Sequence, residues 1–328
     1  FLLMDITDIF KIDNEEDFNN IAISTFRNQY SCVNVYKKYV DTRSVDISSI
    51  RHYTDIPFLP VEFFKSFEIK SKTQKTQKTF MSSGTTNSTR SKHHVTDLKL
   101  YKMSFYDAFQ RHYGNPKDWI ILSLLPSYIE QGDSSLIYMV NSLMDMTKNK
   151  DSQFINIDQP DLSTIINKLS TKKVLLIGVS YALLDLSELF KLNLSNWTIM
   201  ETGGMKGRRK EIIRAELHTI LKKAFKSDQI HSEYGMTELL SQAYSQKDGI
   251  FSAPPWMKVL VREVNDPFNY VENGKTGGLN IIDLANQNSC SFIETKDLGR
   301  KVNSSDFEIS GRFDQSDIRG CNLLSITN

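Results

Sequence analysis

The chain has 328 residues, of which 40% are hydrophobic and 24% charged, and 40 Lys and Arg against 39 Asp and Glu give a formal net charge of +1. So small a charge gives no electrostatic reason to bind nucleic acid or an acidic membrane, and no apolar run approaches the roughly 20 residues that span a bilayer. Cys32, Cys290 and Cys321 are far apart and odd in number, which argues against a disulfide framework or a structural zinc site. We therefore expect a cytoplasmic protein.

The first third of the chain predicts helices and then a short strand. Spaced apolar residues over 15–40 suit two helices that separate near Ser31. The sequence KTFM at 78–81 predicts a strand, and residues 98–113 are predicted to form the next long helix.

Strands and helices alternate over residues 80–250. Continuous apolar runs such as DWIILSLLPS and KKVLLIGVS predict buried strands, each followed by a helix. We interpret QIHSEYGMTELLSQAY in the same way, as strand, turn and helix. From Val259 onward, short strands and turns predict a smaller β region. The alternation predicts an α/β fold in layers, whose ligand-binding loops lie at the strand ends.

The loop from Ser82 to Arg90 has an unusual composition. Its sequence, SSGTTNSTR, offers hydroxyls and successive backbone N–H groups beside Arg90 and Lys92. Small hydroxylic side chains form no reliable helix, so the loop is either slack or holds a ligand rich in oxygen. A nest for phosphate oxygens fits the second reading. The neighbouring His93 and His94 could ligate a metal, but adjacent residues rarely point the same way.

Two further polar stretches follow predicted strands. EYGMTE places Tyr234, Thr237 and Glu238 at a crevice. TKDLGR and SGRFDQSDIRG place Asp297 and Arg312 where hydroxyls or phosphates could be held. Each stretch alone could have a structural role instead of binding a ligand; YGMTE, for example, could be a helix cap. Together, their order and spacing predict one ligand site.

The order SSGTT, YGMTE, KDLGR and GRxD resembles the adenylate-forming superfamily, which includes the acyl-coenzyme A synthetases. A closer resemblance is to the bacterial acyl-protein synthetases, which are related to phenylacetate–coenzyme A ligases. It is carried by IPFLPVEFFKS, SSGTTNSTRSKHH, TGGMKGRRKE, HSEYGMTELLSQAYS and GRFDQSDIRGCNL.

The resemblance implies an α/β fold, namely the large N-terminal domain of an adenylate-forming enzyme. Layered α/β subdomains and a small β region would occupy residues 1–310. A short C-terminal segment, 311–328, would carry Cys321. The mobile lid domain of the superfamily, with its lysine, is expected to be absent or vestigial, since the last lysine of the chain is Lys301.

The resemblance also implies a reaction: a carboxylic acid and ATP, with Mg²⁺, give an acyl-adenylate and pyrophosphate, and the acyl group then passes to a thiol. Thr237 would touch the α-phosphate, Glu238 would bind Mg²⁺, which prefers oxygen ligands, and Arg312 would lie near the ribose. The residues implied to bind the nucleotide are Ser82, Ser83, Gly84, Thr85, Thr86, Arg90, Lys92, Gly203, Gly204, Tyr234, Gly235 and Asp297.

The phosphate-binding loop departs from the usual pattern. A Gly-x-Pro-Lys-Gly continuation is replaced here by a stretch containing Asn87, Arg90 and Lys92. Which cation serves the phosphates, and which replaces the lid lysine, is therefore left open.

Cys321 is the expected acyl acceptor. In acyl-protein synthetases a cysteine near the C-terminus takes the acyl group as a thioester, and a reactive thiolate needs cationic surroundings. Cys32 and Cys290 are instead expected to be small buried residues.

Three functions stay open at this point. The first is transfer of a fatty or aryl acyl group to Cys321 and then to a partner protein. The second is transfer to coenzyme A or a biosynthetic acceptor. The third is a nucleotide-binding subunit without catalysis.

Overall fold

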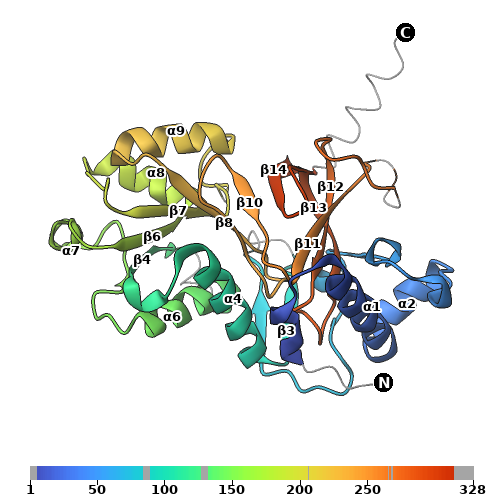
Figure 1. Ribbon diagram of the computed structural model, residues 1–328. Helices are drawn as coiled ribbons and strands as arrows, with labels where there is room; N and C mark the ends of the chain where they lie inside the picture. The colour runs from blue at the N-terminus through green and yellow to red at the C-terminus, as the bar shows by residue number, and fades with distance from the viewer. Residues whose placement is uncertain are drawn as a thin grey trace, which may run out of the picture.

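A 12-stranded sheet runs through the molecule, with helices on both of its faces (Figure 1). The computed structural model describes residues 6–83, 89–126, 132–205, 207–264, 266 and 269–313. Its α-helices are α1 (Glu15–Cys32), α2 (Asn34–Thr42), α3 (Phe63–Ser66), α4 (Leu98–Tyr113), α6 (Ser135–Thr147), α7 (Leu162–Leu169), α8 (Ser180–Leu189) and α9 (Arg214–Phe225). The predicted helices over 15–40 and 98–113 are confirmed.

The strands of the large sheet are β1 (Leu59–Pro60), β4 (Ile120–Leu124), β5 (Gln153–Phe154), β6 (Val174–Val179), β7 (Thr198–Thr202), β8 (Ile230–Tyr234), β9 (Ala243–Ser245), β10 (Ile250–Ser252), β11 (Met257–Arg262), β12 (Gly277–Asp283), β13 (Phe292–Lys301) and β14 (Asp306–Arg312). A separate two-stranded sheet consists of β2 (Lys78–Met81) and β3 (Lys92–Val95).

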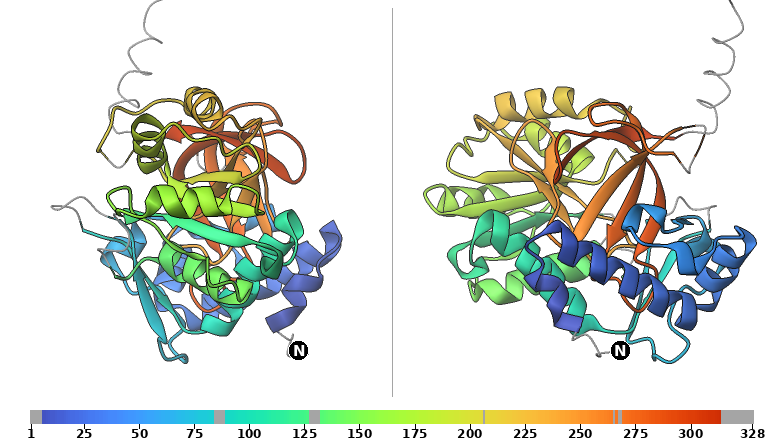
Figure 2. Two further views of the ribbon diagram at one scale, coloured as in Figure 1. Left: turned by 90° about the vertical axis from the view of Figure 1, so that its left-hand side faces the viewer. Right: turned by 45° about the vertical axis from the view of Figure 1, so that its right-hand side comes forward.

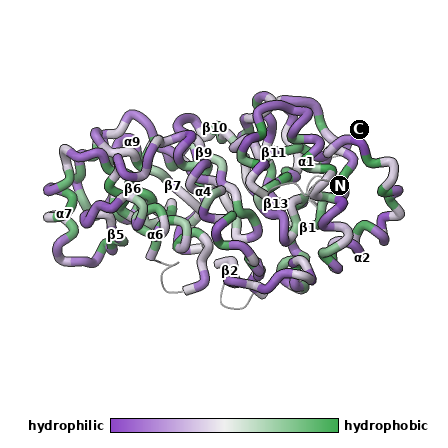
Figure 3. Tube along the Cα trace, turned by 60° about the horizontal axis from the view of Figure 1, so that its bottom comes forward, coloured by the Kyte–Doolittle hydropathy of each residue, from purple (hydrophilic) through white to green (hydrophobic). Residues whose placement is uncertain are grey.

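One half of the large sheet is parallel, in the order β5-β4-β6-β7-β8. Helices α8 and α9 cover one face of it, and α4 and α6 cover the other (Figure 1). Every residue of β4 and β6 is buried, as expected for strands covered on both faces, and the hydropathy colouring shows apolar residues along β6 (Figure 3). The predicted α/β layers are confirmed.

The other half of the sheet is antiparallel, apart from the short β1, which pairs parallel with β13. Beyond β8 the order continues through β9, β10, β14, β13, β12 and β11. The predicted smaller β region is therefore present, and it continues the parallel sheet. As a result, β8 has a parallel neighbour on one side and an antiparallel neighbour on the other.

The N-terminal helices pack beside the antiparallel half (Figure 2). Helix α1 begins at Asn14, whose side chain accepts from the backbone N–H of Asp17, the usual way to satisfy a free N–H at a helix start. The buried Gln29 of α1 donates to the carbonyl of Asn286 at 2.9 Å and accepts from the N–H of Ser291 at 3.0 Å. This exchange of bonds fixes α1 against the turn between β12 and β13.

A buried carboxylate at the end of β12 organises the segment that follows β8. Asp283 is fully buried and accepts hydrogen bonds from the N–H groups of Leu240 and Ser241, at 2.7 and 3.0 Å, and from the Ser241 hydroxyl at 2.5 Å. It also accepts from the N–H of Ala285 at 3.1 Å. The Ser241 hydroxyl in turn accepts from the indole of Trp256 at 2.9 Å, so the network extends into the core.

This network overturns one sequence prediction. The segment after Tyr234 was predicted to form a helix, but residues 235–242 form an irregular turn that leads into β9. A helix would need the N–H groups of Leu240 and Ser241 for its own ladder, whereas here both donate to Asp283. The apolar residues of this segment have helical spacing, but their side chains are buried in a turn.

Among the described residues, no helix has the length and apolar character needed to cross a membrane.

We predict that Asp283→Asn lowers the free energy of unfolding by about 2 kcal/mol, because whichever way the amide turns, at least one buried N–H then faces a donor. Urea denaturation would measure the loss. The exposed Asp228→Asn is the matched control. Equal unfolding midpoints for the two variants would contradict the assigned role of Asp283.

Candidate active site

A β-hairpin brings together the two ends of the predicted phosphate-binding loop. Strands β2 and β3 pair antiparallel, with Met81 opposite Lys92. Just beyond this pair, the N–H of Ser82 donates to the carbonyl of Ser91 at 3.0 Å, and the N–H of Ser91 donates to the Ser82 hydroxyl at 2.9 Å. The loop therefore leaves and returns at one place. Three predicted phosphate-binding residues lie outside the described residues: Gly84, Thr85 and Thr86.

The two cations predicted for this loop are placed differently. The guanidinium of Arg90 donates to the carbonyl of Ser82 and, at 3.4 Å, to that of Met81, so it closes the base of the loop. Lys92 is exposed on β3. Of the two, Lys92 is the cation whose side chain projects from the hairpin.

The loop base lies against the turn at residues 235–242. Ser91 is buried, and its side chain lies close enough to the carboxyl group of Glu238 to lower the pKa of that group. Burial raises the pKa of Glu238, and Ser91 opposes that rise. Asp297 and Arg312 are close enough to act on the same pKa. The motifs predicted to share a site are thus brought together around Glu238.

His93 links the hairpin to the same turn. It is buried on β3, with Nδ1 2.8 Å from the carbonyl oxygen of Thr237 and Nε2 3.1 Å from Oδ1 of Asn286. The Asn286 amide donates to the carbonyls of Glu238, at 2.8 Å, and Cys290, at 2.9 Å. Sequence reasoning considered His93 only as a metal ligand and did not find Asn286. A polar residue just after the buried strand β12 was the available signal.

Tyr234, Asp297 and Arg312 form a direct contact group. The Tyr234 hydroxyl donates to Oδ2 of Asp297 at 2.7 Å, and Nε of Arg312 donates to Oδ1 of Asp297 at 2.9 Å. Asp297 is buried, whereas the Arg312 side chain is 75% exposed. Burial, together with the charge of Asp297, raises the pKa of Tyr234, while the charge of Asp297 raises that of Arg312. Both oxygens of Asp297 are already bonded within the protein.

The β8 end is tightly packed at Gly235, where a larger residue would displace the side chain of Glu233. A Cβ there would lie 2.6 Å from Oε1 of Glu233, too close for an unshifted structure. Glu233 itself is buried and accepts a hydrogen bond of 2.5 Å from the hydroxyl of Thr202, its partner on β7. Gly203 follows Thr202 with a φ of +73°, a conformation that favours glycine. The Gly203–Gly204 turn and the Tyr234 turn therefore start side by side.

Two buried glutamates occupy opposite faces of β7 and β8. Burial raises the pKa of Glu233 to about 7, and the charge of Glu201 adds to this. Burial would also raise the pKa of Glu201, but the bond with His218 and the charge of Arg214 lower it to about 2. Arg214 binds Glu201 at 2.8 Å and the Ile309 carbonyl at 3.3 Å. Neither glutamate was predicted as a site residue.

The fit to a divalent cation rests on Glu238 alone. Among the described residues, no group of three or more His, Cys, Asp or Glu is arranged to hold a metal ion. One carboxylate beside a phosphate-binding loop suits Mg²⁺, which keeps several waters and takes phosphate oxygens as ligands. The residues present fit a nucleotide-borne Mg²⁺.

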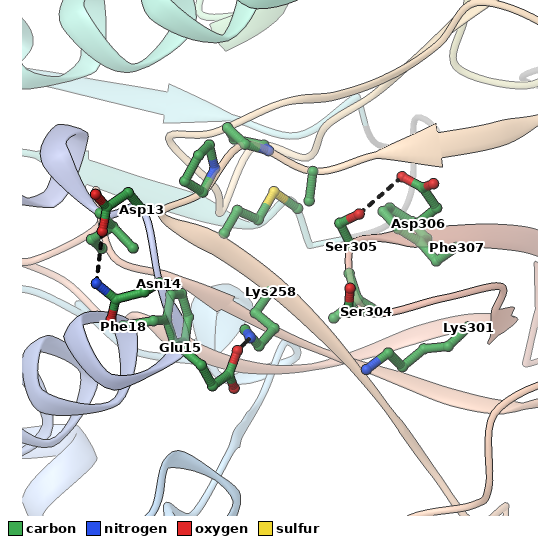
Figure 4. A pocket seen from close by; sticks show the side chains of 16 residues that line it. Asp13, Asn14, Glu15, Phe18, Lys258, Lys301, Ser304, Ser305, Asp306 and Phe307 are labelled. Atoms are coloured by element: carbon green, nitrogen blue, oxygen red, sulfur yellow. Dashed lines mark hydrogen bonds and ion pairs between the residues drawn. The ribbon is translucent and has the colours of Figure 1, made fainter.

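A cavity of about 260 Å³ lies away from these motifs, between the start of α1, the residues before β11 and the turn that leads into β14 (Figure 4). Its charged lining includes Lys301 and Lys258, and Lys258 is ion-paired with Glu15. None of the predicted site residues that the structure describes lines it. Phe307 lines the cavity and also packs on Tyr234, with 5.7 Å between ring centroids, so one aromatic ring separates the cavity from the motif cluster.

Comparison with known proteins supports the resemblance predicted from the motifs. Residues 6–117 match the family model described as "Acyl-protein synthetase, LuxE". No curated protein matches the chain.

Solved structures share the fold. ATP-bound MatB from Rhodopseudomonas palustris superposes with a TM-score of 0.54 at 15% identity over 71% of this chain and 47% of MatB. A 2-hydroxyisobutyryl-CoA ligase in complex with 2-HIB-AMP and CoA superposes with a TM-score of 0.68 at 9% identity, over 92% of this chain and 70% of the ligase. The chain spans about half the length of MatB. Its fold is that of the large domain of adenylate-forming enzymes, as predicted.

We predict that Glu233 makes the protein less stable as the pH rises. Its folded pKa of about 7 lies above the ordinary 4.5, so the stabilisation is complete below pH ~4.5 and is lost as the pH rises through ~7. The loss is on the order of 3 kcal/mol at most. The urea midpoint of the wild type should be lower at about pH 8 than at about pH 5. The midpoint of Glu233→Gln should change less between these two pH values.

The exposed Glu216→Gln is the control and should keep the wild-type slope. An unchanged slope in Glu233→Gln would mean that the folded protein holds Glu233 ionised throughout this range.

Proposed function

We propose that the chain, with its match to the acyl-protein synthetase family model and its adenylate-forming fold, activates a carboxylic acid with ATP. A carboxylate oxygen of the acid attacks the α-phosphorus, the bond to the β-phosphate oxygen breaks, and pyrophosphate leaves. The product is an acyl-adenylate. The observation that carries the proposal is the contact between the end of the phosphate-binding loop and the YGMTE turn, where His93, Thr237 and Asn286 meet beside Glu238.

Each part of this contact supplies one requirement of phosphoryl chemistry, which needs positioning and neutralised charge more than covalent help. Thr237 would contact the α-phosphate, and Glu238 would hold Mg²⁺, which neutralises phosphate charge when bound. Lys92 is the cation projecting beside the loop. The residues proposed to donate to the outer phosphates are Ser82, Ser83, Gly84, Thr85 and Thr86.

The nucleoside would lie against β8 and β13. Tyr234 would pack near the adenine, and Asp297 would accept the ribose hydroxyls. Both Asp297 oxygens have protein partners, so each would share a lone pair with the ribose or exchange a partner. Arg312, largely exposed, is the partner free to move. The backbone at Gly203 and Gly204 would approach the acyl carboxylate.

The acyl group would pass to the thiol of Cys321, which lies outside the described residues. The thiolate attacks the acyl carbon, a C–S bond forms, the bond to the phosphate oxygen breaks, and AMP leaves. The other two cysteines serve poorly as acceptors. Cys290 is buried, as predicted, and burial raises its pKa to about 12. Cys32, predicted to be buried, is partly buried at the end of α1, where it packs against the core.

A second candidate is transfer to coenzyme A, since one structure with this fold is a CoA ligase bound to CoA. This alternative keeps the adenylation step and changes only the thiol. A fatty acid is proposed as the substrate, with an aryl acid as the alternative, and a partner protein as the final acceptor. The reaction needs no contact with nucleic acid.

We predict that wild-type protein gains an acyl mass when incubated with Mg²⁺, ATP and its acid, from a panel of short, medium and long straight-chain acids and aryl acids. Intact-protein mass spectrometry would detect the adduct, and hydroxylamine should remove it as a thioester. Cys321→Ser should gain no such mass, whereas the control Cys32→Ser should gain it as wild type does.

Each other outcome removes one part of the proposal. Pyrophosphate release without an adduct would exclude Cys321 as acceptor and favour an external thiol, which added coenzyme A would identify. ATP binding without pyrophosphate release for any acid would exclude activation and leave a nucleotide-binding subunit.

A further inference from the structure

The imidazole of His93 is held on every side. Its ring edge meets the face of Phe64, with 5.8 Å between ring centroids and planes 86° apart. Both ring nitrogens lie within hydrogen-bond distance of oxygens, on Thr237 and Asn286. The pocket that His93 and Asn286 line has a volume of about 10 Å³, room for no more than one water. The ring is therefore enclosed by Phe64, Thr237 and Asn286.

The hydrogen-bond roles around His93 follow from its partners. The carbonyl of Thr237 can only accept. The amide of Asn286 is oriented by its two donations, to Glu238 and Cys290, so Oδ1 points at Nε2. Burial lowers the pKa of His93 to about 4, and a neutral imidazole carries one N–H, so the ring donates to one of these two oxygens. The closer partner is Thr237, at 2.8 Å from Nδ1.

This bond joins two parts of the proposed site that are far apart in sequence. His93 is two residues beyond Ser91, where the phosphate-binding loop ends on β3. Thr237 lies in the turn after β8 and is the proposed contact to the α-phosphate. The Nδ1–H bond thus connects the phosphate-binding loop, which would hold the outer phosphates, to Thr237, which would face the α-phosphate.

We propose that His93 is a positioning residue, which sets the place of Thr237 and Glu238 relative to the phosphate-binding loop through its Nδ1–H bond to the Thr237 carbonyl. It touches neither the nucleotide nor the acid. The inference rests on the proposed function for its effect on rate, while the connection itself is a property of the folded chain. A misplacement of about 1 Å at a reacting group can slow a reaction about a hundredfold.

The chain offers matched variants. His93→Asn places an amide N–H near the position of Nδ1, so it can rebuild the bond to Thr237. His93→Phe fills the space without any N–H. The neighbouring His94 is the control, because it is only half-buried and bonds the Thr79 hydroxyl at 3.0 Å on the other side of the hairpin. His94→Phe should behave as wild type.

Acid-dependent pyrophosphate release would give kcat and KM for ATP. We expect His93→Phe to lower kcat about tenfold to a hundredfold with KM for ATP little changed, and His93→Asn to recover most of the loss. Equal kcat for His93→Phe and wild type, or no recovery in His93→Asn, would overturn the inference. A purely structural role would instead lower the melting temperature and weaken ATP binding without this split.

Hydrogen–deuterium exchange separates this inference from the proposed function. Without any substrate, His93→Phe should speed exchange in the peptide covering 236–242, and His93→Asn and His94→Phe should not. If wild type releases no pyrophosphate with any acid, the proposed reaction is wrong. The exchange result alone then tests whether His93 holds Thr237 in place. Unchanged exchange in His93→Phe would overturn the inference.

Discussion

Everything at the candidate site depends on the buried turn that follows β8, and on the polar groups that hold it. Asp283 takes the N–H groups of Leu240 and Ser241, and Asn286 donates to the Glu238 carbonyl. Irregular backbone in a core must find partners for its own polar groups, since each unpaired one costs about 1–3 kcal/mol. Side chains from the end of β12 supply those partners. This lets Thr237 and Glu238 face the phosphate-binding loop instead of continuing a helix.

The position of β8 explains why the motifs converge. It is the last parallel strand and the first with an antiparallel neighbour, so its carboxyl end lies where the two halves of the sheet meet. Open α/β sheets bind ligands outside the carboxyl ends of their strands. Tyr234 reaches from this strand to Asp297 on β13, and Arg312 on β14 completes the contact. The parallel half thus contributes the turn, and the antiparallel half contributes the acid and the cation.

The two buried glutamates show how environment decides charge. Glu201 and Glu233 are both enclosed, yet the pKa of the first is lowered to about 2 and that of the second raised to about 7. Arg214 and His218 surround Glu201 with donors and positive charge, whereas Glu233 has the neutral hydroxyl of Thr202. Burial disfavours the charged form unless an opposite charge outweighs it. Glu201, paired with Arg214, lies on the face of the sheet opposite Glu233.

Local periodicity and composition determined most helices and strands of this protein and the candidate motifs, because these features depend on residues that are close together in sequence. The helix at 98–113, the buried strands and the loop at Ser82 were all readable in this way. Periodicity failed at 235–242, where Asp283 captured the backbone N–H groups that a helix needs. The roles of His93 and Asn286 were likewise decided only by tertiary structure, since their partners lie more than a hundred residues away in sequence for His93 and nearly fifty for the Asn286–Glu238 bond. The role of a buried polar side chain depends on the partner that the fold places beside it. Neighbouring residues in the sequence do not predict that partner.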